Sequence, residues 1–244
     1  MTPELQFALE MADAADTVTM TRFRALDLAV ETKPDRTPVT EADRAAEVML
    51  RKMIAERFPS DGIVGEEYED VNPGSARQWV LDPIDGTKNY LRGVPVWATL
   101  IALMVEGVPT LGVVRAPALG RTWWGQIGHG AFTRDIDGTQ RELQVSAIAS
   151  LDDASFSFSD PVGWERFGER SFEALWRATS RVRGYGDFWS HMMVAEGVVD
   201  IAAEPELSPW DQAALTPIVR EAGGTVTGLD GADAFESPST LCTN

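Results

Sequence analysis

Apolar residues recur every three or four positions in two segments near the start of the chain, and this period predicts two amphipathic helices. The first helix is expected over residues 4–30. The second is expected to begin after Thr40, a residue type that caps helix N-termini, and to continue to Phe58, where Pro59 ends it. Two prolines lie in the segment 31–40 between the helices, which is therefore expected to form a loop.

The next part of the chain is rich in β-branched and aromatic residues, which predicts the strands of one sheet. Short strands are expected at 62–67 and 78–83. The turn residues Glu106 and Gly107 separate two longer apolar runs, so these runs are expected to form an antiparallel hairpin of buried strands. Further strands of the same sheet are expected at 121–126 and 130–135.

The second half of the chain alternates between helical and strand patterns after a change in composition at 151–160. The expected elements are a helix over 164–179, a strand near 181–184, a helix from Asp187 to Ala195, a strand at 199–204, a helix from Trp210 to Glu221 and a final strand at 225–229. This pattern predicts an α+β protein with two αβ lobes, 1–146 and 147–244. A cleft between such lobes is the usual location of a small-molecule site.

Composition adds limits on the class of protein. The chain has 244 residues, of which 44% are hydrophobic and 24% charged, as in ordinary soluble globular proteins. Its formal net charge of -17 argues against nucleic acid or an anionic membrane as a partner. The longest apolar run, 94–105, is too short to span a bilayer, and charged residues interrupt any N-terminal signal sequence. A cytoplasmic protein is therefore expected.

The residue types that bind metals limit the kind of metal site. The chain has a single cysteine, Cys242, so it has no internal disulfide and no cysteine-based zinc site. Its two histidines, His129 and His191, also make zinc a poor candidate. We expect any metal to be bound by oxygen atoms, which favours Mg²⁺ or Mn²⁺.

Acidic residues stand where the expected elements begin or end. Asp82 and Asp85 follow a buried strand, and the next residues, Gly86 and Thr87, can begin a helix that receives a phosphate group. An ordinary turn explains the same residues, because Asp, Pro and Gly are common in turns. The other acids of this kind also have simple explanations as helix caps or exposed loop residues, and they are Asp43, Glu66, Glu67 and Asp211.

Taken together, four motifs suggest more than caps and turns. They are VTEAD at 39–43, GEE at 65–67, WVLDPIDGTKNY at 79–90, and WD at 210–211 before a helix that ends in EAGG at 221–224. In their order and spacing, the chain resembles the inositol monophosphatase superfamily of magnesium-dependent, lithium-sensitive phosphatases. The resemblance covers almost the whole chain. It implies a layered αβαβα sandwich, and a homodimer, because members of the family are commonly dimers.

The resemblance also implies a set of metal ligands. Glu66, Asp82 and the backbone carbonyl of Ile84 would hold a first Mg²⁺. Asp82, Asp85 and Asp211 would hold a second ion, with Asp82 bridging the two. A third, weaker ion would bind at Glu66, which is also expected among the catalytic residues. Paired ions about 3.5–4 Å apart neutralise the phosphate and activate a water molecule.

The remaining catalytic roles that the resemblance implies concern the phosphate and the proton. The backbone amides of Gly86 and Thr87 would hold the substrate phosphate, and Asp85 would also lie against the substrate. Thr87, paired with Asp43, would take or orient the proton of the attacking water. No residue is left as a nucleophile, so direct in-line attack without a phosphoenzyme is expected.

Some stretches more specifically resemble the actinobacterial histidinol-phosphate phosphatases, and they lie at 87–103, 183–207 and 217–224. Histidinol carries an ammonium and an imidazole, which acidic side chains can bind by charge-assisted hydrogen bonds. Asp187 and Glu204 are expected to supply them, although a helix cap and a loop acid explain the same residues. His191 is expected to be a packed or surface histidine without a catalytic role.

Two alternatives to a histidinol-phosphate phosphatase stay open. One is an inositol monophosphatase of broad specificity, with which a Glu seven residues before Asp211 is also compatible. The other is a binding or regulatory protein of the same fold, because some relatives act in transcription complexes. The complete set of expected metal ligands favours an enzyme.

Overall fold

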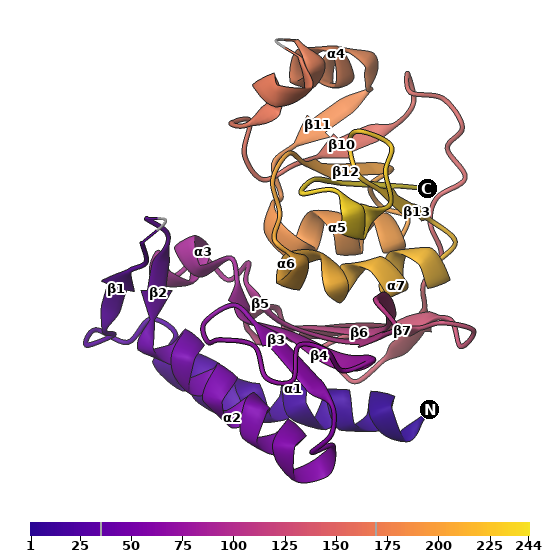
Figure 1. Cartoon of the computed structure of the whole chain (residues 1–244). Coiled ribbons are helices and arrows are strands. Elements are labelled where there is room, and N and C mark those ends of the chain that lie inside the picture. Colours follow the sequence, from indigo (N-terminus) through magenta and orange to yellow (C-terminus); the bar gives the residue numbers. More distant parts are fainter. Residues whose placement is uncertain (35, 169) are drawn as a thin grey trace.

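Figure 1 shows helices and sheets stacked in five layers, which confirms the expected αβαβα arrangement. The structure is a computed structural model that describes residues 1–34, 36–168 and 170–244. The first layer holds α1 (Pro3–Arg22) and α2 (Glu41–Arg57). A seven-stranded sheet, a central layer of helices and a five-stranded sheet follow, and α4 (Ser171–Ala178) covers the far side.

The seven-stranded sheet has the strand order β3-β4-β5-β6-β7-β8-β9, so consecutive strands are neighbours throughout. Its strands are β3 (Gly62–Gly65), β4 (Arg77–Asp85), β5 (Ala98–Val105), β6 (Val108–Ala116), β7 (Arg121–Gln126), β8 (Ala131–Arg134) and β9 (Gln140–Glu142). β3 runs parallel to β4, and the other pairs are antiparallel. The predicted hairpin at Glu106–Gly107 is confirmed. A short 3₁₀ helix, η1 (Pro117–Leu119), links β6 to β7.

The five-stranded sheet has the order β11-β10-β12-β14-β13 and mixes parallel with antiparallel pairs. Its strands are β10 (Ser155–Ser157), β11 (Arg181–Arg183), β12 (Ile201–Glu204), β13 (Thr225–Thr227) and β14 (Thr240–Thr243). The sequence did not predict β10 or β14. Strands of three or four residues give only a weak pattern of apolar and polar side chains, so β11, β12 and β13 were predicted while two strands of the same length were missed. A 3₁₀ helix, η3 (Ala234–Glu236), precedes β14.

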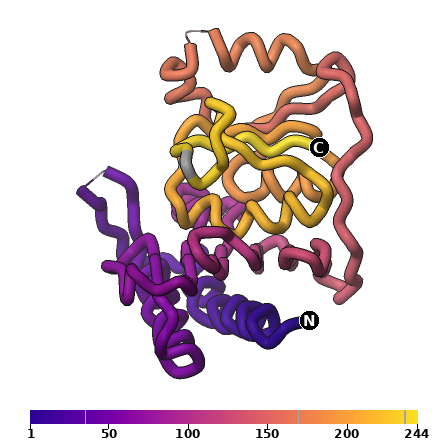
Figure 2. Tube along the Cα trace, turned by 45° about the vertical axis from the view of Figure 1, so that its right-hand side comes forward, coloured from indigo at the N-terminus to yellow at the C-terminus, as the bar shows by residue number. Residues whose placement is uncertain are grey.

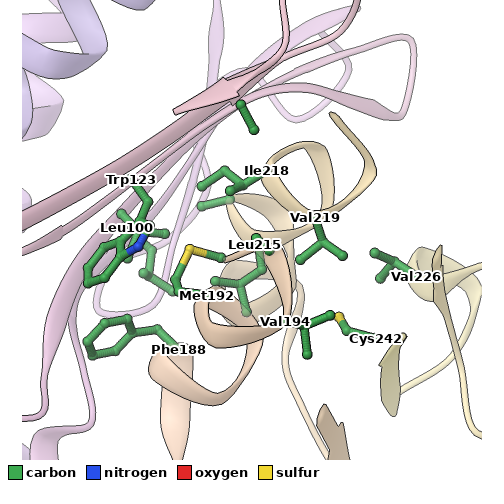
Figure 3. Close-up of a cluster of buried hydrophobic side chains, with 14 of the residues drawn as sticks. Leu100, Trp123, Phe188, Met192, Val194, Leu215, Ile218, Val219, Val226 and Cys242 are labelled. Carbon is green, nitrogen blue, oxygen red and sulfur yellow. The ribbon is translucent and has the colours of Figure 1, made fainter. Parts of the chain in front are cut away.

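The central layer holds α5 (Asp187–Ala195), α6 (Pro209–Ala213) and α7 (Leu215–Glu221), which contact both sheets. Their apolar side chains form one core with those of the sheets, and Figure 3 shows Met192 and Leu215 facing each other there. The central helices approach the seven-stranded sheet closely, because a Cβ atom at Gly112 would lie 2.0 Å from the Ala214 carbonyl oxygen. Any larger residue at position 112 would therefore separate these layers.

The helices predicted over 4–30 and 164–179 do not extend over the whole of these ranges in the structure. The helix expected over 4–30 ends at Arg22, because the next residue adopts an extended conformation and closes the helix with its N–H. The helix expected over 164–179 consists of η2 (Trp164–Phe167) and α4, and Gly168 between them has a φ of 121° that no right-handed helix accommodates. Residue 169 of that expected helix lies outside the described residues.

Two further expectations also need correction. The segment 31–40 is not a simple loop, since β1 (Val30–Thr32) and β2 (Pro38–Thr40) pair as an antiparallel ribbon. The helix expected from Trp210 to Glu221 is divided at Ala214 into α6 and α7. By contrast, Thr40 caps α2 as predicted, because its hydroxyl accepts the Ala42 and Asp43 amides.

The two sheets belong to different halves of the chain. The seven-stranded sheet ends at Glu142 and the five-stranded sheet begins at Ser155. In Figure 2 the segment between them runs along one side of the molecule, from the level of the first sheet to that of the second. The division into lobes 1–146 and 147–244 stays a prediction.

Candidate active site

The site forms where β4 departs from regular pairing. The strand is in register with β5 at Asp82 and again at Asp85, with an irregularity between these two residues. Pro83 lies at this irregularity, where its missing N–H costs no ladder hydrogen bond. The Ile84 amide instead donates to Asp82 Oδ1 at 2.9 Å, and the Thr99 hydroxyl donates to the Pro83 carbonyl at 2.8 Å. The distortion holds both aspartates beside the end of the strand.

Asp211 reaches the same place from the central helical layer. It lies in the first turn of α6, where its Oδ2 accepts the Ser208 amide at 2.7 Å. One carboxylate oxygen from each of Asp82, Asp85 and Asp211 lies within 4.8 Å of the others. Three carboxylates at this spacing can hold a hard divalent cation by oxygen ligands. The structure thus brings together three of the predicted metal ligands.

Burial and mutual repulsion disfavour the charged forms of these carboxyls. Burial raises the pKa of Asp82 and of Asp85 well above its usual value, and neighbouring carboxylates, Glu66 for Asp82 and Asp187 for Asp85, raise it further. Burial likewise raises the pKa of Asp211 to about 7. Ionised carboxylates this close require a compensating cation, so the cluster fits a bound metal.

Glu66 lies directly after β3, and its amide donates to the Leu81 carbonyl at 3.2 Å. Lys33, from the segment between β1 and β2, places its Nζ 2.7 Å from Glu66 Oε1 and 2.6 Å from Glu67 Oε1. The hydrogen bonds with the two glutamates raise the pKa of Lys33 in spite of its burial, so the ammonium stays charged. Sequence reasoning did not select Lys33, because nothing in a segment expected to be a loop indicates which of its side chains turns inward.

Asp43 and Thr87 are brought together from α2 and α3 (Thr87–Leu91). The Thr87 hydroxyl lies 3.3 Å from Asp43 Oδ1 and 3.0 Å from the Ile84 carbonyl oxygen. The other Asp43 oxygen accepts the Thr40 amide at 2.8 Å. Burial raises the pKa of Asp43 to about 6. The carboxylate is thus fixed on one side and available to the Thr87 hydroxyl on the other.

Gly86 connects β4 to α3 at a position that requires glycine. Its φ is 81°, and a Cβ atom there would lie 3.1 Å from the Val96 carbonyl oxygen and 3.3 Å from Asp187 Oδ2. A side chain would therefore be strained and would displace Asp187. The geometry explains why a short turn can place Thr87 next to the carboxylate cluster.

The carboxylate cluster opens into a cavity of about 460 Å³ between the two halves of the chain. Among the predicted residues, Glu66, Asp85, Gly86, Thr87, Asp187, Glu204 and Asp211 line it. Asp187 Oδ2 accepts a hydrogen bond from Asn89 Nδ2 at 2.7 Å, and Glu204 Oε1 accepts one from the Ser159 hydroxyl at 2.7 Å. Burial raises the pKa of Asp187 to about 6 and that of Glu204 to about 8.

A larger groove of about 640 Å³ lies between α1 and α2, but its lining includes none of the residues above. Sequence reasoning missed several residues of the active-site cavity, which come from loops of the second half. They are Ser159, Asp160, Val162, Pro205, Glu206 and Leu207. His191, expected to be packed or on the surface, is buried and also lines this cavity.

The sequence is similar to those of known proteins. A profile of the Inositol monophosphatase family matches residues 1–244. The chain belongs to the inositol monophosphatase family. This membership confirms the phosphatase activity predicted from the sequence, and the family is metal-dependent.

The curated relatives of this chain include histidinol-phosphatases from several bacteria. That of Mycobacterium tuberculosis is 54% identical over 243 residues, covering 99% of this chain and 93% of the relative. That of Streptomyces coelicolor is 55% identical over 246 residues, covering 99% and 92%. Among solved structures, the inositol monophosphatase (IMPase) of Thermotoga maritima is 33% identical with a TM-score of 0.87, covering 100% of this chain and 92% of that one. In the described part of this chain, the helices are too short or too polar to cross a membrane.

Proposed function

We propose that the protein hydrolyses L-histidinol phosphate to L-histidinol and inorganic phosphate, a late step of histidine biosynthesis. The relatives from Mycobacterium tuberculosis and Streptomyces coelicolor, more than half identical over almost the whole chain, support this substrate. The observation that carries the proposal is the excess of acidic groups in the active-site cavity.

Seven carboxylates line this cavity, whereas its described lining contains one lysine, Lys88, and no arginine. Three of the seven, Glu66, Asp85 and Asp211, belong to the proposed metal site. The four that remain are Asp160, Asp187, Glu204 and Glu206, of which Glu206 is paired with Arg166 at 2.8 Å. Carboxylates beyond the phosphate position bind an ammonium by charge-assisted hydrogen bonds, whereas an uncharged polyol would gain much less from them.

Oxygen ligands fit Mg²⁺, and Mn²⁺ can take its place. We propose the ligand set that the family resemblance implies. Glu66, Asp82 and the Ile84 carbonyl would hold one ion; Asp82, Asp85 and Asp211 would hold a second, and a third would bind weakly at Glu66. Bound there, the metal would neutralise phosphate charge and make a water molecule more acidic.

The protein groups would bind the phosphate and move the proton. The backbone amides of Gly86 and Thr87 would donate hydrogen bonds to the phosphate oxygens, with Asp85 beside them. The Thr87 hydroxyl would accept or orient the proton of the attacking water and pass its own proton toward Asp43. The 3.3 Å separation of this pair and the raised pKa of Asp43, about 6, support that role.

An inositol monophosphatase of broad specificity is the second candidate. The similarity to the Thermotoga maritima IMPase favours it, and hydroxyl groups could also bind to Glu204. A binding or regulatory role of the same fold is a third candidate. The three clustered aspartates that could hold a metal are all present, which makes this candidate the weaker one.

We further propose that the protein is a cytoplasmic homodimer that lithium inhibits at the second metal position. These properties rest on the family resemblance. Sedimentation equilibrium would test the dimer, and a lithium titration of phosphate release would test the inhibition.

The proposed activity is tested by phosphate release from L-histidinol phosphate with purified protein. Turnover is expected with Mg²⁺, none with a chelator, and recovery when Mg²⁺ is restored. The Asp85→Asn variant is the matched control for contaminating phosphatase. Absence of turnover by the wild-type protein at saturating Mg²⁺ would refute the proposal.

A further inference from the structure

His191 is a buried residue of α5 whose ring is fixed on one side and unpaired on the other. Its side chain is 1% exposed, and its Nδ1 lies 3.1 Å from Cys242 Sγ on β14. Its Nε2 is buried and has no hydrogen-bond partner among the described residues. The same residue lines the active-site cavity.

A second unpaired polar atom lies in the same region. In the β12–β14 pair, Ala202 is opposite Cys242 and Glu204 is opposite Thr240. Alternate residues of a strand share a face, so Glu204 and Thr240 lie on the face of the sheet that carries Cys242. The Thr240 hydroxyl is also buried without a partner in the described part of the chain.

Buried polar atoms without partners are rare in folded proteins, and each one calls for a ligand, an ion or a water molecule. Here two such atoms are His191 Nε2 and Thr240 Oγ1. His191 lines the cavity together with Glu204, and Thr240 is the cross-strand partner of Glu204. Packing alone does not account for the histidine, because an apolar side chain would fill the same space without an unpaired nitrogen.

The position of His191 along α5 fits the end of the substrate that is remote from the phosphate. The Phe188 amide at the start of α5 donates to Asp85 Oδ2 at 2.8 Å, so this end of the helix adjoins the reacting centre. Asp187 has a φ of 48° and begins α5 outside the helical conformation, and His191 follows about one helical turn later; both residues line the cavity. A short carbon chain between phosphate and ring can span one helical turn, about 5.4 Å.

We propose that His191 is a specificity-determining residue whose Nε2 binds a ring nitrogen of the substrate's imidazole, next to Glu204 and Thr240. This inference rests on the proposed function and extends it to a new residue. Burial lowers the pKa of His191 to about 4, so the ring is neutral and does not repel a cationic substrate.

Either tautomer of His191 suits this role. If Cys242 donates its S–H to Nδ1, then Nε2–H is a donor; in the other tautomer Nε2 is an acceptor. A neutral substrate imidazole offers one donor and one acceptor. One of its nitrogens can therefore pair with His191, and the other with the carboxyl of Glu204 or the hydroxyl of Thr240.

The test compares His191→Asn with His191→Gln. The Asn amide occupies the region of Nδ1 and can contact Cys242, whereas the Gln amide reaches the region of Nε2. We expect His191→Asn to lower kcat/KM for L-histidinol phosphate by about 10-fold or more, mainly through KM, and His191→Gln to retain most of it. Hydrolysis of glycerol 2-phosphate, which has no ring, should fall much less than this in the Asn variant. His129→Asn, in an exposed loop, is the matched control.

An equal loss on both substrates, or an equal loss in the Asn and Gln variants, would overturn the inference. A second measurement uses the wild-type protein, so it does not depend on whether a His191 variant folds. The ¹⁵N shift of Nε2 in labelled wild-type protein should move when L-histidinol is added with Mg²⁺ and phosphate, and the His129→Asn spectrum assigns it. An unmoved resonance at saturating L-histidinol would also overturn the inference.

The proposed function and the role of His191 can be disproved independently of each other. It fails if the wild-type protein prefers inositol 1-phosphate to L-histidinol phosphate. In that case the Asn and Gln variants are compared on inositol 1-phosphate, and equal kcat/KM values would overturn any role of Nε2 in specificity.

Discussion

The Thr87 hydroxyl lies 3.3 Å from Asp43 Oδ1, although the two residues come from different helices and different motifs. The other carboxylate oxygen of Asp43, Oδ2, accepts a hydrogen bond from the Thr40 amide, and the capping box of α2 accounts for this contact. It does not explain the oxygen that faces Thr87. The same carboxylate thus caps α2 and lies within hydrogen-bond distance of a hydroxyl that lines the active-site cavity.

The first prediction concerns this pair. Thr87→Val keeps the shape of the side chain but removes the hydroxyl, so kcat should fall by about 10²–10⁴-fold, the usual size of a proton-transfer contribution. Thr87→Ser keeps the hydroxyl and should retain most of the activity. Steady-state kinetics at saturating Mg²⁺ would measure both, and equal kcat values for Val and Ser would disprove the role of the hydroxyl.

The second prediction concerns the metal cluster. Asp211→Asn removes one of three mutually repelling carboxylates and should reduce kcat by at least about 100-fold, because metal stabilisation of the transition state is worth several kcal/mol. Without metal the variant should melt at the same temperature as the wild type or higher, since repulsion is relieved. Mg²⁺ should raise the Tm of the wild type by more than that of the variant. An unchanged kcat at saturating Mg²⁺ would contradict the assignment of Asp211 as a ligand.

The third prediction is a pH dependence of stability in the metal-free protein. Burial raises the pKa of Asp43 to about 6, that of Asp211 to about 7 and that of Glu204 to about 8. An acid with a higher pKa in the folded than in the unfolded state binds its proton more tightly when folded, so stability falls as pH rises between the two values. With a chelator, Tm should therefore decrease as the pH rises from about 4, the ordinary carboxyl pKa, to about 8, the pKa of folded Glu204.

Saturating Mg²⁺ should flatten this profile, because the cation favours the ionised carboxylates at the metal site. Differential scanning calorimetry at several pH values, with and without Mg²⁺, would measure it. A metal-free Tm that rises across this range would show that the buried acids are already ionised and compensated by other groups.

The fourth prediction concerns the substrate end of the cavity. Glu204→Gln keeps the size of the side chain and its contact with Ser159 but cannot ionise when a cationic substrate binds beside it, so kcat/KM for L-histidinol phosphate should fall by about 10-fold or more. The value for glycerol 2-phosphate should fall much less, since its uncharged glycerol group makes no charge-assisted hydrogen bond with the carboxylate. A similar loss on both substrates would mean that Glu204 supports the fold of the site and does not select the substrate.

Sequence reasoning located the residues of the site well where short motifs mark the end of an element. Asp82, Asp85 and Asp211 were selected because each stands at a strand or helix terminus, and the structure places their oxygens together. The period of apolar residues also predicted α2 and the β5–β6 hairpin, because these elements are long enough to repeat the pattern.

Other features depend on contacts that no local pattern encodes. Lys33 contacts Glu66 because the ribbon of β1 and β2 folds over the site, and the sequence shows a loop there. The pairing of His191 with Cys242 depends on β14, a strand of four residues. The catalytic roles and substrate contacts of the individual residues stay predictions until the variants are measured.

The central claim is that acidic groups beyond the metal site select a cationic phosphate monoester. The most direct test is the ratio of kcat/KM for L-histidinol phosphate to that for inositol 1-phosphate, measured with the wild-type protein at saturating Mg²⁺. We predict a ratio of at least about 100, as expected when paired charges discriminate against an uncharged alcohol. A ratio below one would contradict the claim and identify the protein as an inositol monophosphatase.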